Sequence, residues 1–227
     1  MTTLNGTPEH DTTTSHPATS HTAAPHPEPT PPPGKRALLV LAHPRADSLT
    51  AELARRVRAR LADDAFAVDL LDLHAEGFDP RMTTLDEPDW ADHDKVYSPE
   101  VRAHMARIDA ADVIVVVFPL WWFGLPAMLK GWIDRVWNHG FAYGRSEPRL
   151  RGKRMFWISL VSYPQDQFAR LGWDDIVTRT IGSGISAFCG IEDASVHFVY
   201  DSLNAGETAL TSVDAALDVF VRTAPTP

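Results

Sequence analysis

Short apolar runs alternate with amphipathic segments along most of the chain. The clearest run, residues 113–118, is β-branched and uninterrupted, which is typical of a strand buried on both faces of a sheet. In residues 124–137 apolar side chains recur every three or four positions, which predicts a helix with one buried face. The same two patterns predict strands at residues 37–42, 66–73, 113–118, 155–161 and 195–200, and helices at residues 48–61, 101–108, 124–137, 173–188 and 209–221.

This alternation predicts a single α/β domain over residues 35–227. Helical crossovers make successive strands parallel and cover both faces of the sheet, which gives a three-layer sandwich. Five strands favour the order 2-1-3-4-5 of flavodoxin-like sheets over a Rossmann sheet. Residues 1–34 are rich in Thr, Pro, His and Ser and carry almost no large apolar side chains, so we expect a disordered tail there.

Composition and charge narrow the class of protein. Of the 227 residues, 44% are hydrophobic and 22% are charged, as in soluble globular proteins. The longest apolar run, residues 113–125, is shorter than the ~20 residues that cross a bilayer, so we expect no membrane insertion. The net charge of −9 disfavours a nucleic-acid partner, because phosphate backbones attract clustered Lys and Arg. The single cysteine, Cys189, fits a cytoplasmic enzyme and, in its apolar surroundings, a small buried side chain.

Several familiar kinds of site are disfavoured. The sequence holds no G-x-S-x-G elbow, no H-E-x-x-H, no cysteine cluster and no P-loop. The G-x-G-x-x-A pattern at residues 182–187 lies inside a predicted helix, so we do not interpret it as a phosphate loop. Acidic residues gather in a polar connector without the spacing of a metal loop, which predicts a solvated segment and no metal site. They are Asp86, Glu87, Asp89, Asp92 and Asp94, with His93 among them.

The loop at residues 42–50 is the first candidate for chemistry. In an open α/β sheet, ligands bind beyond the carboxyl ends of the strands, next to the switch point in strand order. Ser48 is a natural N-cap, and the helix that it begins offers free N–H groups and a positive dipole end to a phosphate. His43, Arg45 and Thr50 could add contacts. From these residues alone, a phosphate site and an ordinary capped loop are about equally supported.

The loop after the third strand carries three adjacent aromatic residues, Trp121, Trp122 and Phe123. Exposed loops seldom carry such a group, so a flat aromatic ligand or a dimer interface is expected there, and both can hold together. Trp132 and Trp137 recur at helical spacing and are expected in the core or an interface.

A third loop, at residues 138–144, combines His139 with Tyr143. Either side chain could hydrogen-bond a quinone oxygen or a flavin carbonyl, and either could be structural.

These segments resemble the NAD(P)H:quinone oxidoreductase branch of the flavodoxin-like superfamily, which includes DT-diaphorase and the ancillary subunits of potassium efflux systems. The most specific match is FPLWWFGLPAMLKGWIDRV at residues 118–136, continuing to HGFAYG at residues 139–144. The first loop and SGISAFCG at residues 183–190 support it. The likeness runs from about residue 36 to residue 221.

The resemblance implies a flavin site built from the first two loops. It places His43, Ser48, Leu49 and Thr50 at the flavin phosphate, and Pro119, Leu120, Trp121, Trp122 and Phe123 along the isoalloxazine and ribityl. It also implies a homodimer with the active site at the subunit interface, and it puts Tyr143 near the acceptor.

Two positions depart from the family pattern. After the fourth strand the family has a Thr-Thr-Gly-Gly loop against the flavin ring, whereas this chain has VSYPQ at residues 161–165. Ser162, Tyr163 and Gln165 are candidates for replacing its hydrogen bonds. A second tyrosine that some members place two residues after the first is Arg145 here.

The function implied is an NAD(P)H-dependent flavoenzyme that reduces quinones or related acceptors. FMN is the expected cofactor and FAD the alternative. In a ping-pong cycle NAD(P)H would pass hydride to the flavin and leave, and the acceptor would then take two electrons, polarised or protonated by Tyr143 or His139. Two alternatives stay open: a regulatory flavoprotein subunit of a potassium efflux system, and a reductase dedicated to one biosynthetic metabolite.

Overall fold

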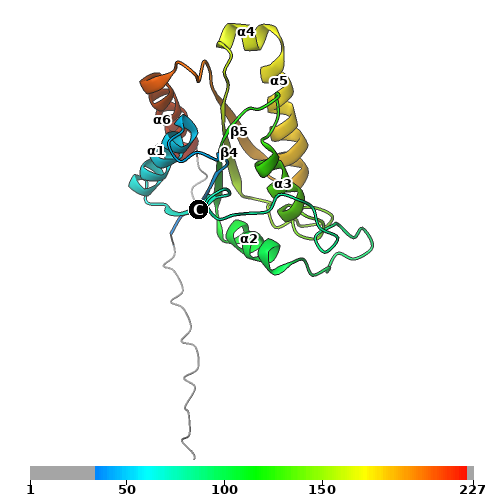
Figure 1. The fold of residues 1–227 in the computed structure, drawn as a ribbon. Coiled ribbons are helices and arrows are strands. Elements are labelled where there is room, and N and C mark those ends of the chain that lie inside the picture. The colour runs from blue at the N-terminus through cyan, green and yellow to red at the C-terminus, as the bar shows by residue number, and fades with distance from the viewer. Residues whose placement is uncertain (1–33, 224–227) are drawn as a thin grey trace, which may run out of the picture. The chain divides into compact units, whose positions relative to one another are not determined.

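The computed structural model describes residues 34–223, so the tail predicted over residues 1–34 lies outside it except for Gly34. Five parallel strands form one sheet in the order β2-β1-β3-β4-β5, which confirms the predicted order and fold class (Figure 1). The strands are β1 (Arg36–Leu41), β2 (Ala67–Asp72), β3 (Val113–Pro119), β4 (Arg154–Leu160) and β5 (Asp193–Val199).

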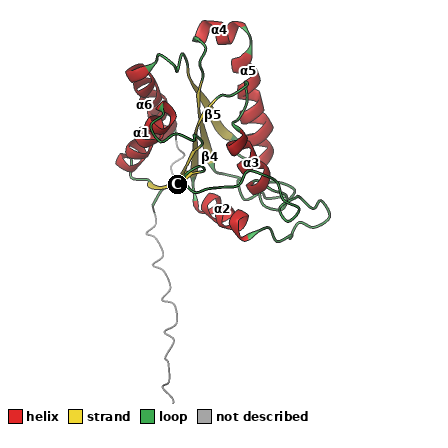
Figure 2. Ribbon diagram, in the orientation of Figure 1, coloured by secondary structure: helices red, strands yellow, loops and turns green. Residues whose placement is uncertain are grey.

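Helices cover both faces of the sheet, as Figure 2 shows. On one face α1 and α6 pack against alternate residues of the central strands, such as Leu39 and Val115. On the other face α2, α3 and the helical segments between residues 173 and 189 cover the intervening residues, such as Val40 and Val116. The helical segments are α1 (Leu49–Asp63), α2 (Pro99–Ala110), α3 (Ala127–Val136), α4 (Gln165–Arg170), α5 (Trp173–Thr178), the π-helix η1 (Arg179–Ser186), the 3₁₀ turn η2 (Ala187–Cys189) and α6 (Gly206–Arg222).

The core confirms three of the predictions made for single residues. Trp132 is fully buried and Trp137 is 3% exposed, so both belong to the core. Cys189 is buried as well, and burial raises the pKa of its thiol to about 12, which makes it a poor nucleophile at neutral pH.

Two helix boundaries differ from the prediction, each for a local reason. α3 begins at Ala127 rather than at residue 124, because Gly124 pairs with Trp121 in a tight turn and Pro126 serves as the N-cap. The single helix predicted over residues 173–188 is a succession of α, π and 3₁₀ turns that ends at Gly190, whose φ is 84°. Within residues 34–223, no helix is long and apolar enough to cross a membrane.

The long polar stretch between β2 and α2 has little regular structure and packs beside α3. We call residues 79–98 of this stretch the connector. Two glycines allow it to approach closely: a Cβ on Gly131 of α3 would lie 2.2 Å from the carbonyl oxygen of Pro80, and a Cβ on Gly140 would lie 2.1 Å from that of His93. The connector is therefore held against α3 and the loop after it.

Candidate functional site

The ends of three neighbouring strands bring the predicted ligand loops together. β1 pairs with β3, and β3 pairs with β4, so that Leu41 lies opposite Val117 and Pro119 opposite Leu160. The loops that follow these strands therefore leave the same carboxyl edge of the sheet, where open α/β sheets bind ligands. We call the residues at this edge, His43 to Thr50, Trp121 to Phe123 and Ser162 to Tyr163, the strand-end site.

The first loop confirms Ser48 as the N-cap of α1. Its Oγ accepts a hydrogen bond from the N–H of Ala51 at 3.2 Å and donates one to the carbonyl of Arg45 at 2.8 Å. Within residues 34–223 the N–H groups of Leu49 and Thr50 have no hydrogen-bond acceptor. Free N–H groups at the positive end of a helix dipole suit an anion such as a phosphate.

His43 and Arg45 take different positions in this loop. His43 is half-buried, and burial lowers the pKa of its imidazole below the ordinary value, so the ring is neutral at pH 7. Its Nδ1 accepts the N–H of Arg45 at 3.1 Å, and its ring lies 6.1 Å from that of Trp121. The guanidinium of Arg45 pairs in solvent with Asp47 at 3.0 Å. His43 therefore links the first two loops, and Arg45 is turned toward Asp47.

The second loop is a tight turn whose two central residues have left-handed backbone. Trp122 has a φ of 50° and Phe123 a φ of 58°, while Trp121 and Gly124 exchange hydrogen bonds of 3.1 and 3.0 Å across the turn. Residues with side chains adopt this conformation at a cost of about 1 kcal/mol or more each. Within the described chain the N–H groups of Trp122 and Phe123 have no acceptor. We call this strained segment, residues 121–124, the aromatic turn.

The three aromatic side chains of the turn differ in how far they are exposed for contact with a ligand. Trp122 is 97% exposed and Trp121 is 45% exposed. The ring of Phe123, by contrast, stacks on that of Trp173 with centroids 4.0 Å apart, and the ring of Tyr163 lies 5.9 Å away. One face of Phe123 is therefore already covered, and the two indoles remain to meet a ligand or a partner.

The loop after β4 places its candidate residues near the aromatic turn but in different surroundings. Ser162 and Gln165 are exposed, and Gln165 is the first residue of α4, a helix that the sequence pattern did not predict. The ring of Tyr163 is half-buried between Phe123 and Phe168. Pro119 and Leu120 are half-buried at the base of the aromatic turn, where the N–H of Leu120 bonds Leu160 at 2.8 Å.

His139 and Tyr143 do not lie at the strand-end site. They follow α3, which runs back from the carboxyl edge of the sheet and, with 10 residues, rises about 15 Å along its axis. His139 is 3% exposed and lies beneath Trp90 and His93, with ring centroids at 5.2 and 4.5 Å. Tyr143 is half-buried, and burial raises the pKa of its phenol, so the hydroxyl keeps its proton at neutral pH.

Tyr143 lines a cavity of about 410 Å³ with mostly apolar walls. The ring of Phe188 lies 5.4 Å from that of Tyr143, and the ring of Trp90 lies 5.8 Å from it. Both partners are exposed on their other sides. We call this the aromatic cavity. Its lining is Pro80, Met82, Pro88 and Trp90 of the connector, Ile133, Asp134 and Trp137 of α3 and its end, Tyr143, and Gly184, Ile185, Phe188 and Cys189.

The prediction of a wholly solvated acidic connector is wrong at Asp86. This carboxylate is completely buried and accepts hydrogen bonds from Arg135 at 2.7 Å and from the N–H of Ser98 at 2.8 Å. Burial alone would raise its pKa, but these bonds and those from Thr83 outweigh it, so the pKa of Asp86 is lowered. The other acidic residues of the stretch are exposed, as predicted. Within residues 34–223 no group of three or more potential ligands is placed to hold a metal ion.

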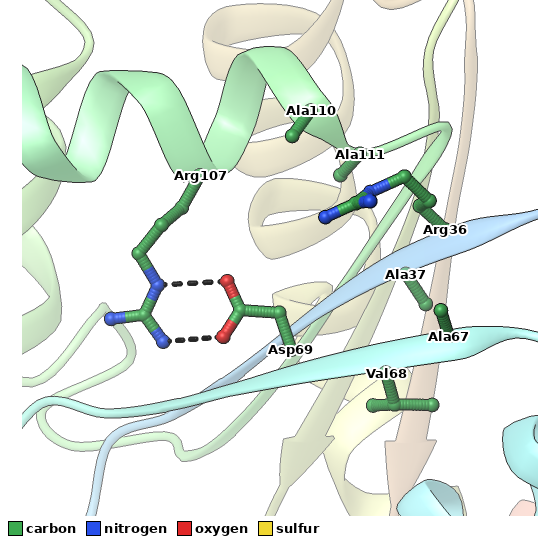
Figure 3. A pocket seen from close by; sticks show the side chains of 8 residues that line it. All are labelled: Arg36, Ala37, Ala67, Val68, Asp69, Arg107, Ala110 and Ala111. Atoms are coloured by element: carbon green, nitrogen blue, oxygen red, sulfur yellow. Dashed lines mark hydrogen bonds and ion pairs between the residues drawn. The ribbon is translucent and has the colours of Figure 1, made fainter. Parts of the chain in front are cut away.

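A second hollow, about 150 Å³, lies at the opposite edge of the sheet (Figure 3). Arg107 of α2 reaches across it to Asp69 of β2, with hydrogen bonds of 2.9 and 2.8 Å, and Arg36 points toward it. It lies at the amino ends of β1 and β2, away from the edge where ligands bind in such sheets. We assign it a structural role, because its ion pair fastens α2 to the edge strand.

The sequence did not identify several residues of the strand-end site and of the aromatic cavity. Trp173 follows a short helix that the pattern did not predict. Phe188 was included only in the predicted helix at residues 173–188 and in the segment at residues 183–190 that resembles the family. Trp90 is the clearest omission, because a tryptophan isolated in a charged connector is itself a signal for a contact. The pairing of Asp86 with Arg135 gives no local signal, since the two residues are far apart in the sequence.

The fold is that of an open α/β protein, and the candidate site lies at the carboxyl edge of its sheet. Residues 35–222 match the family model described as the flavodoxin-like fold, and the chain belongs to that family.

Two similar proteins have oxidoreductase names. An uncharacterized NAD(P)H oxidoreductase of Escherichia coli K12, YcaK, is 43% identical over 169 residues, which cover 74% of this chain and 85% of the relative. NAD(P)H dehydrogenase [quinone] 1 of Rattus norvegicus is 29% identical over 188 residues, which cover 73% of this chain and 69% of the relative. Neither name refers to potassium efflux or to a single biosynthetic metabolite.

Solved structures share the fold. An NAD(P)H:quinone oxidoreductase from Methanothermobacter marburgensis superposes with a TM-score of 0.76 at 19% identity, covering 85% of this chain and 97% of that one. An FMN-dependent NADH-azoreductase from Bacillus anthracis, solved with FMN, gives a TM-score of 0.60 at 17% identity, covering 82% of this chain and all of that one.

Proposed function

We propose that this protein is an NAD(P)H-dependent flavoenzyme that reduces quinone-like acceptors by two electrons. The observation that carries the proposal is the set of free main-chain N–H groups beside exposed indoles at the strand-end site. The N–H groups of Leu49 and Thr50 suit a phosphate, and Trp121 and Trp122 suit a flat ring. The names of the two relatives support NAD(P)H as donor and a quinone as acceptor. We place the enzyme in the cytoplasm, where its single thiol would stay reduced.

FMN is the flavin that we propose. His43, Ser48, Leu49 and Thr50 would hold its phosphate, and Pro119 to Phe123 would lie along its ribityl and ring system. The N–H groups of Trp122, Phe123, Ser162 and Tyr163, which have no acceptor within residues 34–223, would bond the ring's polar edge. FMN requires donors for its phosphate and a surface for its ring, and a solved structure of the same fold holds FMN. The bound flavin supplies two-electron hydride chemistry between the donor and the acceptor.

The acceptor belongs, in this proposal, to the aromatic cavity. Its aromatic walls suit a planar ring, and the phenol of Tyr143, which keeps its proton, can donate a hydrogen bond to a quinone oxygen. The sequence predicted His139 as a candidate catalytic residue, but at 3% exposure its side chain cannot contact an acceptor. We propose instead that His139 positions Tyr143, whose ring lies 5.7 Å away.

The separation of the two regions favours a homodimer. The strand-end site and the aromatic cavity lie toward opposite ends of α3, so a ring bound at the first cannot meet an acceptor bound in the second within one chain. A second copy that brings its strand-end site to the cavity would join them. The exposed aromatic residues Trp122 and Phe188 are the kind of side chain that such an interface would bury.

Purification of the full chain tests this function. We expect a yellow protein from which heat releases a chromophore with the mass of FMN, and which turns over NADH or NADPH repeatedly only when an acceptor such as menadione is present. Steady-state rates at varied donor and acceptor should give parallel double-reciprocal lines, because the two substrates bind in turn.

The control is the double variant Trp121→Ala/Trp122→Ala, which leaves the core untouched and should lose bound flavin. A colourless wild-type protein that takes up neither FMN nor FAD and leaves NAD(P)H unoxidised would overturn the proposal. A released chromophore with the mass of FAD would correct the cofactor and leave the reaction in place.

A further inference from the structure

Trp90 is placed at the mouth of the aromatic cavity by contacts on its inner face. Its ring lies 5.2 Å from that of His139 and 5.8 Å from that of Tyr143, while the residue as a whole is 70% exposed. One side of the indole therefore covers the proposed acceptor pocket, and the other side faces solvent. Trp90 and Phe188 both line that pocket, and their rings lie 5.8 and 5.4 Å from that of Tyr143.

A buried ion pair fixes the connector on the N-terminal side of Trp90. Asp86 is completely buried and pairs with Arg135 of α3 at 2.7 Å. Arg135 also pairs with Glu100 at 2.9 Å, and the amide of Asn138 donates to the carbonyl of Asp86 at 2.5 Å. A buried charge pair that is hydrogen-bonded on all sides is costly to open, so this part of the connector stays on α3.

The connector is fixed again just after Trp90. Arg145 donates to the carbonyl of His93 at 2.7 Å and pairs with Asp94, and the hydroxyl of Tyr97 donates to the carbonyl of His139 at 2.7 Å. Because anchors flank it on both sides, Trp90 is held as a fixed wall over Tyr143 and is not a freely moving loop residue.

The lining of the cavity indicates which acceptors would fit. Rings of Trp90, Tyr143, Phe188 and Trp137 surround it, and its volume of about 410 Å³ lies in the range of small-molecule sites. The hydroxyl of Tyr143, which keeps its proton at neutral pH, is the hydrogen-bond donor that this lining offers to a carbonyl oxygen. Aromatic walls with few donors favour a neutral, planar compound large enough to touch opposite walls.

We propose that Trp90 is a specificity-determining residue that makes the enzyme prefer bicyclic aromatic acceptors, such as naphthoquinones, over single-ring quinones. A bicyclic ring reaches the indole when it stacks beside Tyr143, and a single ring leaves that contact unmade. This inference rests on the proposed function and adds to it the class of acceptor. Within its own chain the aromatic contacts of Trp90 are with His139 and Tyr143 and not with the strand-end site, so flavin binding should not depend on it.

The test compares menadione with 1,4-benzoquinone in the wild-type holoenzyme and in Trp90→Ala and Trp90→Phe. Loss of one aromatic contact should lower the ratio of kcat/KM for menadione over benzoquinone by about 3- to 10-fold in Trp90→Ala. Trp90→Phe should restore most of the ratio. Leu203→Ala, which truncates another exposed apolar side chain, is the matched control and should leave the ratio unchanged.

Two further measurements separate selectivity from general damage. Equilibrium dialysis of menadione against the oxidised holoenzyme, without NAD(P)H, should show a dissociation constant raised by a similar factor in Trp90→Ala. Flavin content should be unchanged, because the proposed flavin contacts lie at the strand-end site and Trp90 lines the aromatic cavity.

An unchanged menadione-to-benzoquinone ratio with unchanged menadione binding would overturn the inference and leave the proposed function standing. A wild-type protein that reduces no quinone at all would overturn both, so the two failures can be told apart.

Discussion

At the scale of single residues, Ser48 joins fold and function in one hydroxyl group. Its Oγ satisfies the N–H of Ala51 and thereby leaves the N–H groups of Leu49 and Thr50 as the free donors at the start of α1. Thr50 is buried, so what it offers a phosphate is its main-chain N–H rather than its side chain. The same arrangement begins α1 and leaves free donors where we propose that the flavin phosphate binds.

Replacement of Ser48 by Ala should therefore weaken both properties. Loss of an N-cap hydrogen bond lowers the free energy of unfolding by about 1 kcal/mol, and FMN affinity should fall because the loop loses its bond to Arg45. Urea unfolding of the apoprotein and fluorescence titration with FMN measure the two effects. Ser146→Ala, at an exposed position, is the control. Full stability and full FMN affinity in Ser48→Ala would contradict this role.

Sequence reasoning succeeded for residues whose role depends on neighbours in the chain. Ser48 was predicted as a cap from its position before an apolar period, and the buried Trp132 from its spacing. It failed where burial is decided by distant residues. Asp86 sits among solvated acids and is buried only because Arg135 reaches it from α3. His139 is buried because the connector brings Trp90 and His93 over it.

At the scale of elements, the aromatic turn keeps a conformation that its residues disfavour. Both Trp122 and Phe123 lie in the left-handed region, and Trp122 is almost wholly exposed. Neither core packing nor a hydrogen bond of its side chain accounts for a tryptophan at that position. Strain of this kind, held by the flanking bonds between Trp121 and Gly124, is typical of ligand sites.

Trp122→Asn should accordingly change stability and binding in opposite directions. Asn adopts the left-handed conformation more readily, so the free energy of unfolding of the apoprotein should rise by up to about 1 kcal/mol. FMN affinity should fall, because the indole is lost. Thermal unfolding of the apoprotein and flavin titration of the same samples decide the matter. A less stable protein, or one that binds FMN as well as the wild type, would argue against a strained ligand turn.

The connector is held in place by ion pairs rather than by helices or strands of its own. Asp86→Asn leaves Arg135 buried without its main partner and should lower the free energy of unfolding at pH 7 by about 3 kcal/mol. In the folded protein the pKa of Asp86 is lowered, so its contribution is present above the unfolded value of about 3.9 and is lost as pH falls through the folded value.

The difference between wild type and variant should thus be large at neutral pH and shrink below about pH 4, as urea unfolding at several pH values would show. Asp47→Asn breaks only an exposed pair with Arg45, which solvent screens, and should leave the free energy of unfolding nearly unchanged at every pH. A difference that does not depend on pH would contradict the assignment of a charged Asp86.

The order of the elements was predictable because strand and helix periods are local and parallel topology follows from their alternation. What the pattern did not predict is the α4 segment and the late start of α3. In both cases a proline is the N-cap, Pro126 or Pro164. Before Pro126 the turn is closed by hydrogen bonds between Trp121 and Gly124, and before Pro164 the carbonyl of Tyr163 accepts a hydrogen bond from Asp201, which follows β5.

At the scale of the whole molecule, we propose that a complete active site needs two copies of the chain. The strand-end site and the aromatic cavity lie at different ends of α3, and the exposed aromatic residues of each would be covered by the other. Light scattering after size exclusion should give about twice the chain mass of 25.1 kDa. Phe188→Asp should shift the protein toward monomer and abolish quinone reduction while flavin stays bound. An active wild-type monomer would exclude this arrangement.

The most direct test of the central claim is a crystal structure of the protein grown with FMN. We expect electron density for a ring against the aromatic turn, with its phosphate on the N–H groups of Leu49 and Thr50. A flavin bound elsewhere, or a strand-end site that stays closed to it at saturating concentration, would contradict the account.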